Sequence, residues 1–502
     1  MSAFVLGLDV YQLTTLIAHA AAGRLDPLSG GTSFAGGSGL GMSFFFRRLP
    51  KNRNYVVWAG LRSIVEHCEE LRFTPEELRT LDEHPILGPG LKIGGVGGPG
   101  PAVRAALARL NGFVGDIDAL PEGTLAFAGP ALDSEGRPVI IEDTPLVAYT
   151  PLIQVRTDLV CAKLIETPWL SRLNYMSMVA SKAARVVTAA TFDGQRRGVL
   201  EFGQRRTHPA AALDGAYAAY LAGCRGTSNL LATHRYGIPS FGTMDHFALQ
   251  AAEQDEVSIQ DSETTFFRTF TALFPQASTL LVDTYDTARG IANAVRGTEG
   301  RCMGVRLDSN VTPETVRQAR QLLVQLGAPG VAIFVSDGLD EWRVRELAEA
   351  GADGFGVGEN ISCVPDAATG IGAVGKLVLN GYGKLTMKLA RGSGKATLPG
   401  LLQAYRFSDH DLLCMRDEPA PDGGKPLLQP LWRGSKLVAP LPTLAESRAH
   451  VSQQIEALPD RLRALEPVAP EGQWPIRLSS RLLAVVQELV RAAVADGSAS
   501  KK

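Results

Sequence analysis

At 502 residues, the chain is long enough to bury a large core and to hold two or three domains, or one large barrel with a second domain attached. Its formal charge of -2 excludes a global electrostatic field that would recruit nucleic acid or an anionic membrane. No uninterrupted apolar run reaches the roughly 18 to 20 residues of a membrane span, and the first residues lack the basic region of a secretory signal, so we expect a cytoplasmic protein.

Two stretches near the N-terminus, residues 30–41 and 88–101, predict loops because they are rich in glycine and proline. The first lacks the Lys-Ser/Thr ending of a P-loop, which favours a flexible loop over a phosphate-binding one. Strand-like segments from Phe113 to Tyr149, separated by turn residues, predict a small β-rich region. A helical pattern follows from Leu159 to Ala190.

The most regular part of the chain lies between residues 278 and 378, where four apolar strand-like runs begin about 24 residues apart. The runs are STLLVDTY, RCMGVRLDS, GVAIFVSD and ADGFGVGE. Amphipathic helical segments such as PETVRQARQLLVQLG lie between them. Continuous apolar strands alternating with helices indicate parallel strands buried on both faces, in either a barrel or a doubly wound sheet.

Three of these runs end in aspartates, Asp283, Asp308 and Asp337, and the fourth ends in the GVG stretch at 356–358. In a barrel such strand ends meet at one mouth, where the chemistry takes place. Helix capping explains any single aspartate equally well. Three carboxylates at corresponding strand ends favour a functional site.

After about residue 400 the alternation of strands and helices stops, and proline-rich segments occupy residues 419–442. A terminal helix is expected from about 477 to 496, followed by a disordered tail at 496–502.

One histidine, His246, lies beside an aspartate where GIPSFGTMDHFALQ at 237–250 predicts a strand running into a helix. Histidine serves as an acid, base or nucleophile in many enzymes. A histidine that donates one hydrogen bond and packs its ring is also common in ordinary cores, so position alone leaves its role open.

Eight stretches match, in the same order, the motifs of one enzyme family. They are DVYQLTT at 9–15, FFFRRLPKNRNYVVWAGL at 44–61, LEFGQRR at 200–206, GCRGTSNLLA at 223–232, GTMDH at 242–246, LLVDTYDT at 280–287, GVRLDS at 304–309 and FGVG at 355–358. Through them the chain resembles the nicotinate phosphoribosyltransferase family over most of its length.

The resemblance implies an α/β fold with an open or irregular β/α barrel, here residues 126–400, and a second α+β domain built from residues 1–125 and 401–495. It implies a homodimer with active sites at the subunit interface. The reaction joins nicotinate to phosphoribosyl pyrophosphate, with Mg²⁺ and with ATP hydrolysis coupled through a phosphorylated histidine. His246 occupies the matching position, and Asp283 is the matching carboxylate that would fix the opposite ring nitrogen.

The resemblance also assigns residues to the substrates. Phe202 and the partner subunit's Tyr11 would stack on the two faces of the pyridine ring. Arg205 and Arg306 would bind carboxylate and phosphate oxygens. Asp308 would accept hydrogen bonds from ribose hydroxyls.

Four further residues are assigned to phosphate, and one to the choice of acceptor. Gly356 and Gly358 would offer backbone N–H groups to the 5′-phosphate, while Lys376 and Lys395 would add positive charge. Ser228 lies where nicotinamide-using relatives carry an acidic side chain, and a neutral hydroxyl avoids repulsion of about 1 to 4 kcal/mol at 4 Å. This favours an acid as substrate. No residue is assigned as a metal ligand.

The sequence departs from the family at several positions in these motifs. They are Asp245, Phe247, Asn310, Val311, Glu359 and Arg225, the last at a position where the family favours aspartate. Asn310 and Val311 replace a Gly-Asp pair and remove a carboxylate suited to Mg²⁺ and pyrophosphate. The departures leave three alternatives. The first is a working enzyme in which Arg225 and Glu359 pair. The second is an altered enzyme that uses another acceptor, transfers phosphoribosyl without ATP coupling, or acts in the hydrolytic direction on a pyridine nucleotide. The third is a catalytically silent relative that binds nucleotide and regulates a partner.

Overall fold

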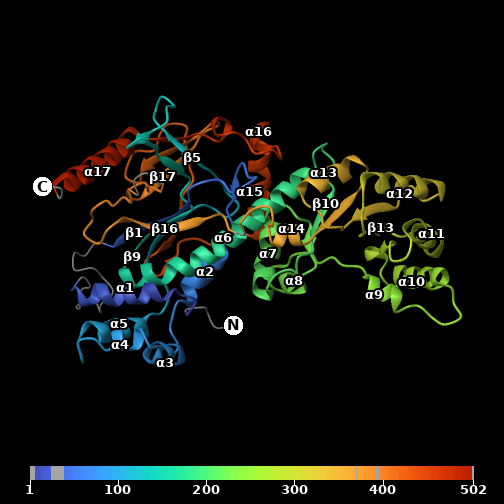
Figure 1. Ribbon diagram of the computed structural model, residues 1–502, viewed down its shortest axis with the longest axis horizontal. Helices are drawn as coiled ribbons and strands as arrows, with labels where there is room; N and C mark the ends of the chain where they lie inside the picture. The colour runs from blue at the N-terminus through green and yellow to red at the C-terminus, as the bar shows by residue number, and fades with distance from the viewer. Residues whose placement is uncertain (1–5, 24–38, 369, 390–394, 500–502) are drawn as a thin grey trace.

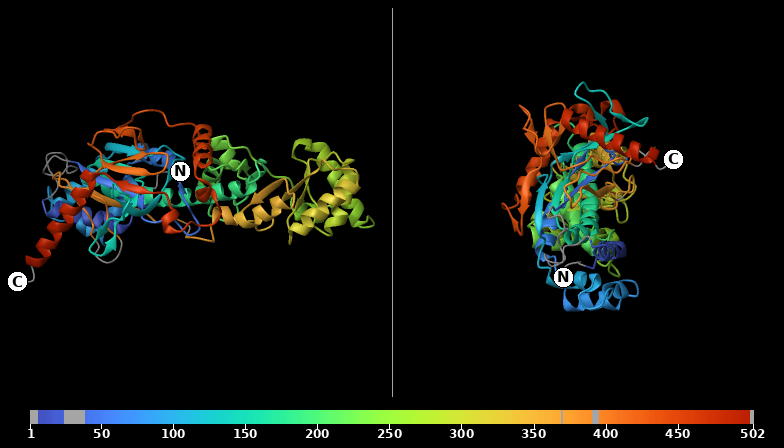
Figure 2. Two further views of the ribbon diagram at one scale, coloured as in Figure 1. Left: turned by 90° about the horizontal axis from the view of Figure 1, so that it is seen from above. Right: turned by 90° about the vertical axis from the view of Figure 1, so that its left-hand side faces the viewer.

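The chain forms two lobes joined along one long helix, α6 (Leu159–Ala190), which confirms the helix predicted there. The structure, a computed structural model, describes residues 6–23, 39–368, 370–389 and 395–499. Figure 1 shows α6 running out of the lobe that carries α1 and α17 into the lobe that carries β10 and β13, and the view from above in Figure 2 shows the same elongated arrangement. None of the helices in the described ranges combines the length and apolar character of a membrane span.

The second lobe is built on six parallel strands in the order β11-β10-β15-β14-β13-β12. The strands are β10 (Gly198–Glu201), β11 (Gly226–Thr227), β12 (Thr279–Leu281), β13 (Gly304–Leu307), β14 (Ala332–Val335) and β15 (Gly354–Val357). The helices are α7 (Pro209–Leu221), α8 (Leu230–Tyr236), α9 (His246–Gln250), α10 (Ile259–Leu273), α11 (Thr287–Thr298), α12 (Pro313–Gln325), α13 (Glu341–Glu349) and α14 (Glu359–Ser362).

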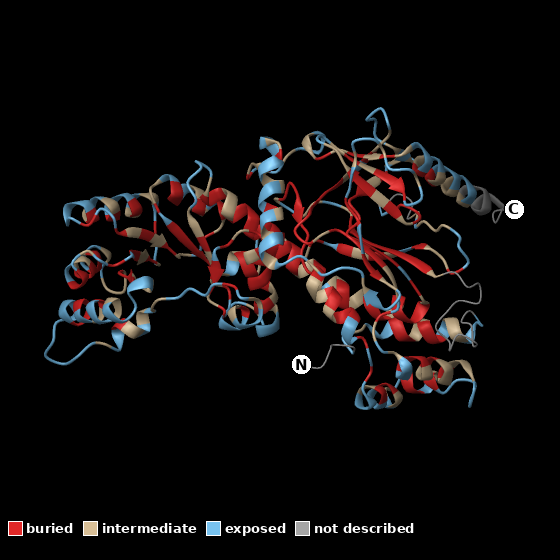
Figure 3. Ribbon diagram, turned by 180° about the vertical axis from the view of Figure 1, so that it is seen from behind, coloured by how far each residue is buried: buried red, intermediate tan, exposed pale blue. Residues whose placement is uncertain are grey.

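The four strand-like runs of the sequence form β12 to β15, so the prediction of an open β/α barrel is confirmed. Leu280, Val305, Ile333 and Phe355 from these strands are fully buried. Helices cover the sheet, and Figure 3 shows buried residues along α6 and along the strands. The strands therefore read as apolar runs because both of their faces are covered.

The first lobe contains two larger sheets that combine segments from both ends of the chain, as predicted for the second domain. One has the order β16-β1-β9-β3-β20-β21, and the other has the order β19-β17-β18-β22-β5-β8. Their strands are β1 (Leu40–Phe46), β3 (Gly115–Ala119), β5 (Ala128–Leu132), β8 (Val147–Tyr149), β9 (Ile153–Thr157), β16 (Ala373–Leu379), β17 (Leu402–Arg406), β18 (Asp411–Met415), β19 (Lys425–Pro426), β20 (Gln429–Arg433), β21 (Lys436–Leu437) and β22 (Ile476–Leu478). Two small antiparallel pairs, β2 (Val56–Val57) with β4 (Leu125–Ala126) and β6 (Ile140–Ile141) with β7 (Thr144–Pro145), complete the β-structure of the described residues.

The remaining helices belong to the terminal segments. They are α1 (Val10–Ala21), α2 (Leu61–Glu70), α3 (Pro75–Glu83), α4 (Leu87–Leu91), α5 (Pro99–Arg109), α15 (Leu444–Ala457), α16 (Asp460–Arg463) and α17 (Ser480–Ala499). The predicted disordered tail at 496–502 is helical as far as Ala499, and residues 500–502 lie outside the described ranges.

The parallel sheet occupies residues 198–357, a narrower span than the range 126–400 predicted for the barrel domain. Strand β9 pairs with β1 and β3, and β16 pairs with β1, all in antiparallel register. Strands β5 and β8 pair with each other beside β22. These strands fall inside the residue range predicted for the barrel, but they form hydrogen bonds with strands of the terminal segments. They therefore belong to the first lobe, because the strands with which a segment pairs decide the lobe in which it lies.

The prediction of a loop over residues 88–101 is wrong at both ends, where α4 and α5 form. Here the glycines serve close packing between helices: a Cβ on Gly88 would lie 2.2 Å from the Asp82 carbonyl oxygen, and one on Gly100 would lie 2.4 Å from that of Gly90. Pro99 stands at the first position of α5, where no N–H is needed. Of the other predicted loop, residues 30–38 lie outside the described ranges, and Leu40 and Gly41 belong to β1.

A buried ionic cluster fastens α6 to α13 and to the segment before β16. The fully buried Glu341 on α13 accepts hydrogen bonds from Lys182 and, at 2.9 Å, from Arg185. Lys182 also contacts Asp366 at 3.0 Å, and Asp366 in turn pairs with Arg53 of the first lobe at 3.0 Å. Burial alone would raise the pKa of Glu341, but Lys182 and Arg185 outweigh it and lower the pKa. The carboxylate is therefore charged, and it stabilises the contact between helices.

We expect Glu341→Gln to lower the free energy of unfolding by about 3 to 5 kcal/mol at pH 7, because it leaves Lys182 and Arg185 buried with less compensation. Urea unfolding measures the change, and Glu346→Gln is the matched control. Glu346 lies on the same helix, half-exposed beside Arg343 at 3.2 Å, and should cost at most about 1 kcal/mol. Since the folded state lowers the pKa of Glu341, its contribution is present above the unfolded pKa and is lost as pH falls through the folded one. Equal stabilities for E341Q and the wild type at pH 7 would contradict this role.

Candidate functional site

A cleft of about 780 Å³ lies at the carboxyl ends of the parallel strands. The chain turns after β10, β11, β13 and β15 supply its walls together with the start of α9. Eight of the residues predicted for the site line it, namely Phe202, Arg205, Ser228, His246, Arg306, Asp308, Gly356 and Gly358. Parallel strands bring their carboxyl ends to one edge, which explains why residues distant in the sequence meet here.

Asp308 is the most connected carboxylate of the cleft. The Ser336 hydroxyl donates to its Oδ1 at 2.6 Å. Its Oδ2 lies 3.6 Å from an Arg306 nitrogen and 3.7 Å from the His246 Nε2. Its backbone N–H donates to the Asp283 carboxylate at 2.6 Å. The last contact confirms that Asp283 and Asp308 lie at the same end of the sheet.

The His246 ring is held differently from the sequence prediction. Its Nδ1 lies 3.0 Å from the Thr284 hydroxyl, and its Nε2 faces Asp308. The predicted contact between His246 and Asp283 is replaced by these two, because the Asp283 carboxylate is turned to the N–H of Asp308. Thr284, the residue that follows Asp283, thus makes the contact that orients the His246 ring.

Asp283 keeps one unsatisfied oxygen. Its Oδ1 is buried and has no hydrogen-bond partner among the described residues. The described residues hold no group of three or more His, Cys, Asp and Glu side chains arranged for a metal ion. A cation held here would therefore need ligands from a bound substrate in addition to the protein.

Arg306 is the most buried cation of the cleft. One of its terminal nitrogens donates to the Met244 carbonyl at 3.0 Å, while its Nε is buried without a partner among the described residues. Burial lowers the pKa of Arg306, the Asp308 and Asp283 carboxylates oppose that change, and Arg205 adds to it. A guanidinium remains charged at any physiological pH, so Arg306 and Arg205 present two positive charges to an anion.

Phe202 lies where β10 and β15 meet, and two glycines make room for it. Its N–H donates to the Val357 carbonyl at 2.9 Å. A Cβ on Gly356 would lie 2.4 Å from the Phe202 ring, and one on Gly358 would lie 3.2 Å from the Phe202 carbonyl oxygen. The GVG stretch, predicted as a phosphate cradle, therefore also has a steric role at the ring.

The floor beneath Phe202 contains a buried acid that the sequence analysis did not single out. Glu201 accepts a hydrogen bond from the Thr227 hydroxyl at 2.6 Å and another from the N–H of Gly203. Burial raises the pKa of Glu201, and the two donors oppose it. The carboxylate ties β10 to β11 and fixes the turn that carries Phe202.

Two departures beside His246 have local explanations. Asp245 caps α9, because its carboxylate accepts the N–H of Ala248 at 3.0 Å. Phe247 is 74% exposed and lines the cleft. The aspartate therefore serves the helix start, while the phenylalanine adds an apolar surface to the rim.

The departures after β13 and β15 are also resolved. Asn310 has a φ of 51°, a left-handed conformation that glycine or asparagine adopts most readily. The buried Val311 donates its N–H to Asp337 at 2.8 Å, so Asp337 serves the turn and does not line the cleft. Glu359 lies 3.8 Å from Arg206. The hypothesis of an Arg225–Glu359 pair is wrong, since Arg225 lies at the opposite ends of the strands.

Four predicted residues do not line the cleft of the same chain: Asp283, whose carboxylate accepts the N–H of Asp308, and Tyr11, Lys376 and Lys395. Tyr11 is half-exposed on α1, and Lys376 on β16 lies 4.0 Å from Glu166 of α6. Burial raises the pKa of Tyr11, and Glu166 adds to the effect, which places the two near each other. Lys395 is exposed and does not line the cleft. Figure 1 shows α1 and β16 in the other lobe from α9 and β13.

Two residues that orient the site were missed in the sequence, Thr284 and Ser336. Each lies next to an aspartate that was singled out, in VDT and in VSD. A serine or threonine next to an aspartate at a strand end was therefore the sequence feature that could have identified them. Side chains alternate in direction along an extended segment, so of two neighbours only one faces the cleft.

Comparison with known proteins covers the whole chain. The family model for the quinolinate phosphoribosyl transferase C-terminal domain matches residues 179–367, and that for the nicotinate phosphoribosyltransferase C-terminal domain matches residues 421–485. The nicotinate phosphoribosyltransferase pncB2 of Mycobacterium tuberculosis is 36% identical over 97% of this chain and 94% of its own length, and the human nicotinate phosphoribosyltransferase is 28% identical over 96% of each. The crystal structure of human nicotinic acid phosphoribosyltransferase matches with a TM-score of 0.72 and 25% identity, over 96% of this chain and 99% of that chain.

We expect Gly356→Ala to displace the Phe202 ring, because the added methyl group would overlap it. Overpacking of this kind costs about 1 to 3 kcal/mol of stability, and the displaced ring should weaken nicotinate binding about tenfold. Calorimetric titration with nicotinate and a crystal structure of the variant measure the two effects. Gly330→Ala is the control, since a Cβ at Gly330 meets nothing within 4 Å. Unchanged nicotinate affinity with an unmoved ring would show that the close approach does not shape the cleft.

Proposed function

The chain belongs to the nicotinate phosphoribosyltransferase family and joins nicotinate to phosphoribosyl pyrophosphate in NAD salvage, and we propose that ATP hydrolysis is coupled to this transfer through phosphate on His246. The observation that carries the proposal is the Asp308 carboxylate, which lies within 3.7 Å of both the His246 ring and the Arg306 guanidinium. A nucleotide phosphate and the ribose would meet at this point of the cleft.

For the acceptor, Phe202 provides one flat apolar face at the floor of the cleft. Arg205 provides a fork-shaped cation for the carboxylate of the pyridine ring, and Ser228 presents a neutral hydroxyl to it. This combination favours an acid over an amide, because a cation and a neutral hydroxyl would face the substrate's carboxylate.

In the transfer step, the pyridine nitrogen forms a bond to C1 of the ribose while the bond from C1 to the pyrophosphate oxygen breaks. Pyrophosphate leaves with the electron pair. Asp308 would accept hydrogen bonds from the ribose hydroxyls, and Ser336 holds it in place from the other side. Arg306 would stabilise the charge that develops on the departing oxygens.

For ATP coupling, the Nε2 of His246 must present a lone pair to the γ-phosphorus. If the Nδ1–H donates to the Thr284 hydroxyl at 3.0 Å, the lone pair is on Nε2. The bond from Nε2 to phosphorus then forms as the bond to the ADP oxygen breaks. We propose Thr284 as the residue that fixes this tautomer, in place of Asp283.

Mg²⁺ fits this cleft as a cation carried by the substrate's phosphates. Asp308 and the unpartnered Oδ1 of Asp283 would hold it, since Mg²⁺ commonly takes one or two protein carboxylates and completes its shell with phosphates and water. Bound there, it would neutralise charge on the pyrophosphate group.

We propose that the enzyme is a homodimer in which Tyr11 and Lys376 complete the cleft of the partner. Both lie beside Glu166 in the first lobe. Burial lowers the pKa of Lys376, Glu166 opposes it, and Arg47 contributes to the lowering, so several cations gather there. In this proposal Tyr11 of the partner subunit supplies the second flat face of the pyridine slot, opposite Phe202.

A second candidate function is transfer without ATP coupling or to another aromatic acid. Glu359 lines the cleft and places a carboxylate near the expected phosphate cradle. Its contact with Arg206 at 3.8 Å is long and both side chains are about half-exposed, so the pair neutralises the carboxylate weakly. This charge opposes phosphate binding.

We expect His246→Ala to abolish ATP-dependent stimulation and the acid-labile phosphate label from [γ-³²P]ATP, while slow ATP-independent transfer to nicotinate persists. Thr284→Val should reduce the rate of labelling by roughly tenfold or more, because it removes the hydrogen bond that orients the His246 ring. Thr284→Ser keeps the hydroxyl group and should therefore keep the wild-type rate. Wild-type protein that forms nicotinate mononucleotide without label or ATP stimulation would rule out the coupling and favour the second candidate.

For the dimer, we expect Tyr11→Ala to raise KM for nicotinate about tenfold or more, since stacking contributes on the order of 1.4 kcal/mol. Mixing the Tyr11→Ala and His246→Ala chains tests the shared site directly, because a hybrid dimer regains one site with both residues. At a nicotinate concentration well below the raised KM, ATP-stimulated activity should rise on mixing above that of either variant alone. The exposed Tyr382 provides the control substitution, Tyr382→Ala. Full activity from a stable monomer would exclude the shared site.

A further inference from the structure

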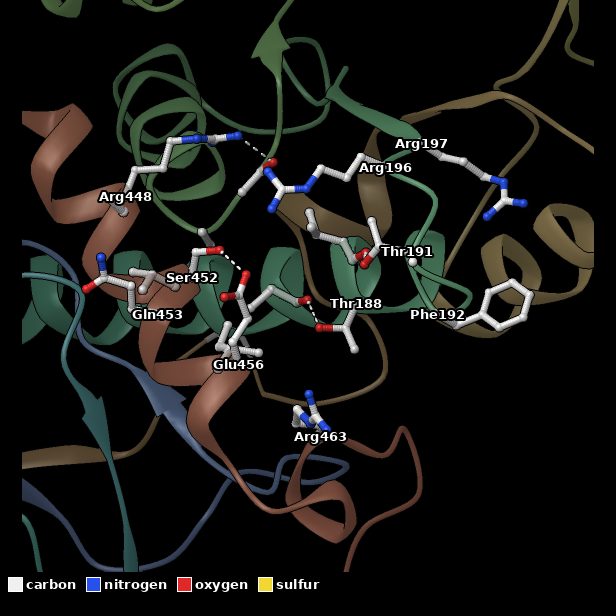
Figure 4. A pocket seen from close by; sticks show the side chains of 18 of the residues that line it. Thr188, Thr191, Phe192, Arg196, Arg197, Arg448, Ser452, Gln453, Glu456 and Arg463 are labelled. Carbon is white, nitrogen blue, oxygen red and sulfur yellow. Dashed lines mark hydrogen bonds between the residues drawn. The ribbon is translucent and has the colours of Figure 1, made fainter. Parts of the chain in front are cut away.

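A second cavity, here called the rear cavity, lies at the opposite ends of the strands from the cleft. It measures about 1160 Å³ and is bounded by the C-terminal end of α6, the entries to β10 and β11, and helices α13, α15 and α16. Its position between α6 and the C-terminal segment is seen in Figure 4. None of the residues assigned to the reaction lines this cavity.

The rear cavity is strongly cationic, because six arginines and only two carboxylates line it. The arginines are Arg196, Arg197, Arg225, Arg345, Arg448 and Arg463, and the acids are Glu456 and Asp460. An excess of like charge at one place costs free energy unless counter-charges balance it. The partners of each guanidinium therefore decide what the cavity can bind.

Three of the arginines are already committed to the protein. Arg197 pairs with Asp193 through two nitrogens, at 2.8 and 2.9 Å. Arg448 donates to backbone carbonyls at the end of α7, including that of Gly223 at 2.8 Å. Arg463 pairs with Asp460. These interactions fix the walls of the cavity and account for one of its two carboxylates.

The other three arginines have no carboxylate partner in the described part of the chain. Arg196 and Arg225 are exposed and their guanidinium groups make no hydrogen bond or ion pair there. Arg345 lies over the Phe192 ring at 4.2 Å, and its Nε is buried without a partner among the described residues. In Figure 4 the Arg196 side chain reaches across the cavity toward Arg448, while Arg197 is turned away from it.

Arg225 lies against the start of β10 and near Arg448. A Cβ on Gly198 would lie 2.8 Å from the Arg225 side chain, so the absent side chain at Gly198 lets Arg225 lie across the start of β10. Burial lowers the pKa of Arg448, and the charge of Arg225 adds to that lowering. Two guanidinium groups held near each other, as Arg225 and Arg448 are, are typical of sites that bind anions.

We propose that the rear cavity binds an anion carrying phosphate groups, with Arg196 and Arg225 as its principal ligands and Arg345 as a third. Guanidinium groups bind phosphate oxygens through paired N–H donors, and they are the preferred residues for this purpose. The remaining acid, Glu456, accepts a hydrogen bond from Ser452 at 3.1 Å and leaves a positive excess. The volume accommodates a diphosphate group together with its water shell.

The same proposal accounts for Arg225, where the family favours aspartate. An aspartate at that position would offer the other arginines a carboxylate and so offset part of the charge. With arginine there, the charge excess is larger and an exogenous anion is needed to balance it. The binding site does not depend on the proposed function, because none of its three ligands lines the cleft.

Titration calorimetry with inorganic pyrophosphate in Mg²⁺-free buffer tests the proposal. The starting protein carries Arg205→Ser, Arg206→Ser and Arg306→Ser, which removes the three arginines that line the cleft. It should still bind pyrophosphate, and adding Arg196→Ser with Arg225→Ser should weaken the affinity tenfold or more. The matched control adds Arg79→Ser with Arg268→Ser, two exposed arginines on α3 and α10. This control should leave the affinity unchanged.

Equal pyrophosphate affinity in the rear-cavity and control variants would overturn the proposal, as would the absence of binding to the starting protein. A second measurement does not depend on any variant. Crystals of the wild-type protein soaked in tungstate should show anomalous density between the guanidinium groups of Arg196 and Arg225. Density confined to the cleft or to the first lobe would also overturn it.

Discussion

The pairing of β10 with β15 is the interaction on which the rest of the second lobe depends. These strands are neighbours in the sheet although about 150 residues separate them, and the chain visits β11 on one side before it builds β12 to β15 on the other. A cleft forms outside the carboxyl ends of the strands at such a change of direction. Leu200 faces Gly356 in this register, which brings the Phe202 ring over the glycine.

The repeating strands could be predicted from the sequence because they are buried on both faces and read as continuous apolar runs. Asp283 and Asp308 could be placed at one edge for the same reason, since strand ends of one sheet converge. Strands β10 and β11 carry no such signal, as they contain four and two residues. The boundaries of the lobes could not be predicted from the sequence either. Strands β9 and β16 belong to the first lobe because they pair with β1, which is far away in the sequence.

The prediction of the site succeeded and failed along similar lines. Strand-end side chains were found, but their hydrogen-bond partners depended on side-chain directions that sequence spacing does not give. Asp337 illustrates this, since it satisfies the N–H of Val311 and takes no part in the cleft. Thr284 illustrates the reverse case, because a residue with no charge occupies the contact with the His246 ring that a carboxylate was expected to make.

Departures from a family pattern have different meanings, and the local structure distinguishes them. Asn310 retains the left-handed backbone that glycine would adopt, and Asp245 caps the helix that presents His246. Both substitutions therefore preserve the geometry of the cleft. Arg225 preserves nothing comparable: it adds charge at the start of β11, one short strand away from Ser228. Its charge instead adds to the excess of arginines at the rear of the strands that carry the cleft, where we propose that an anion binds.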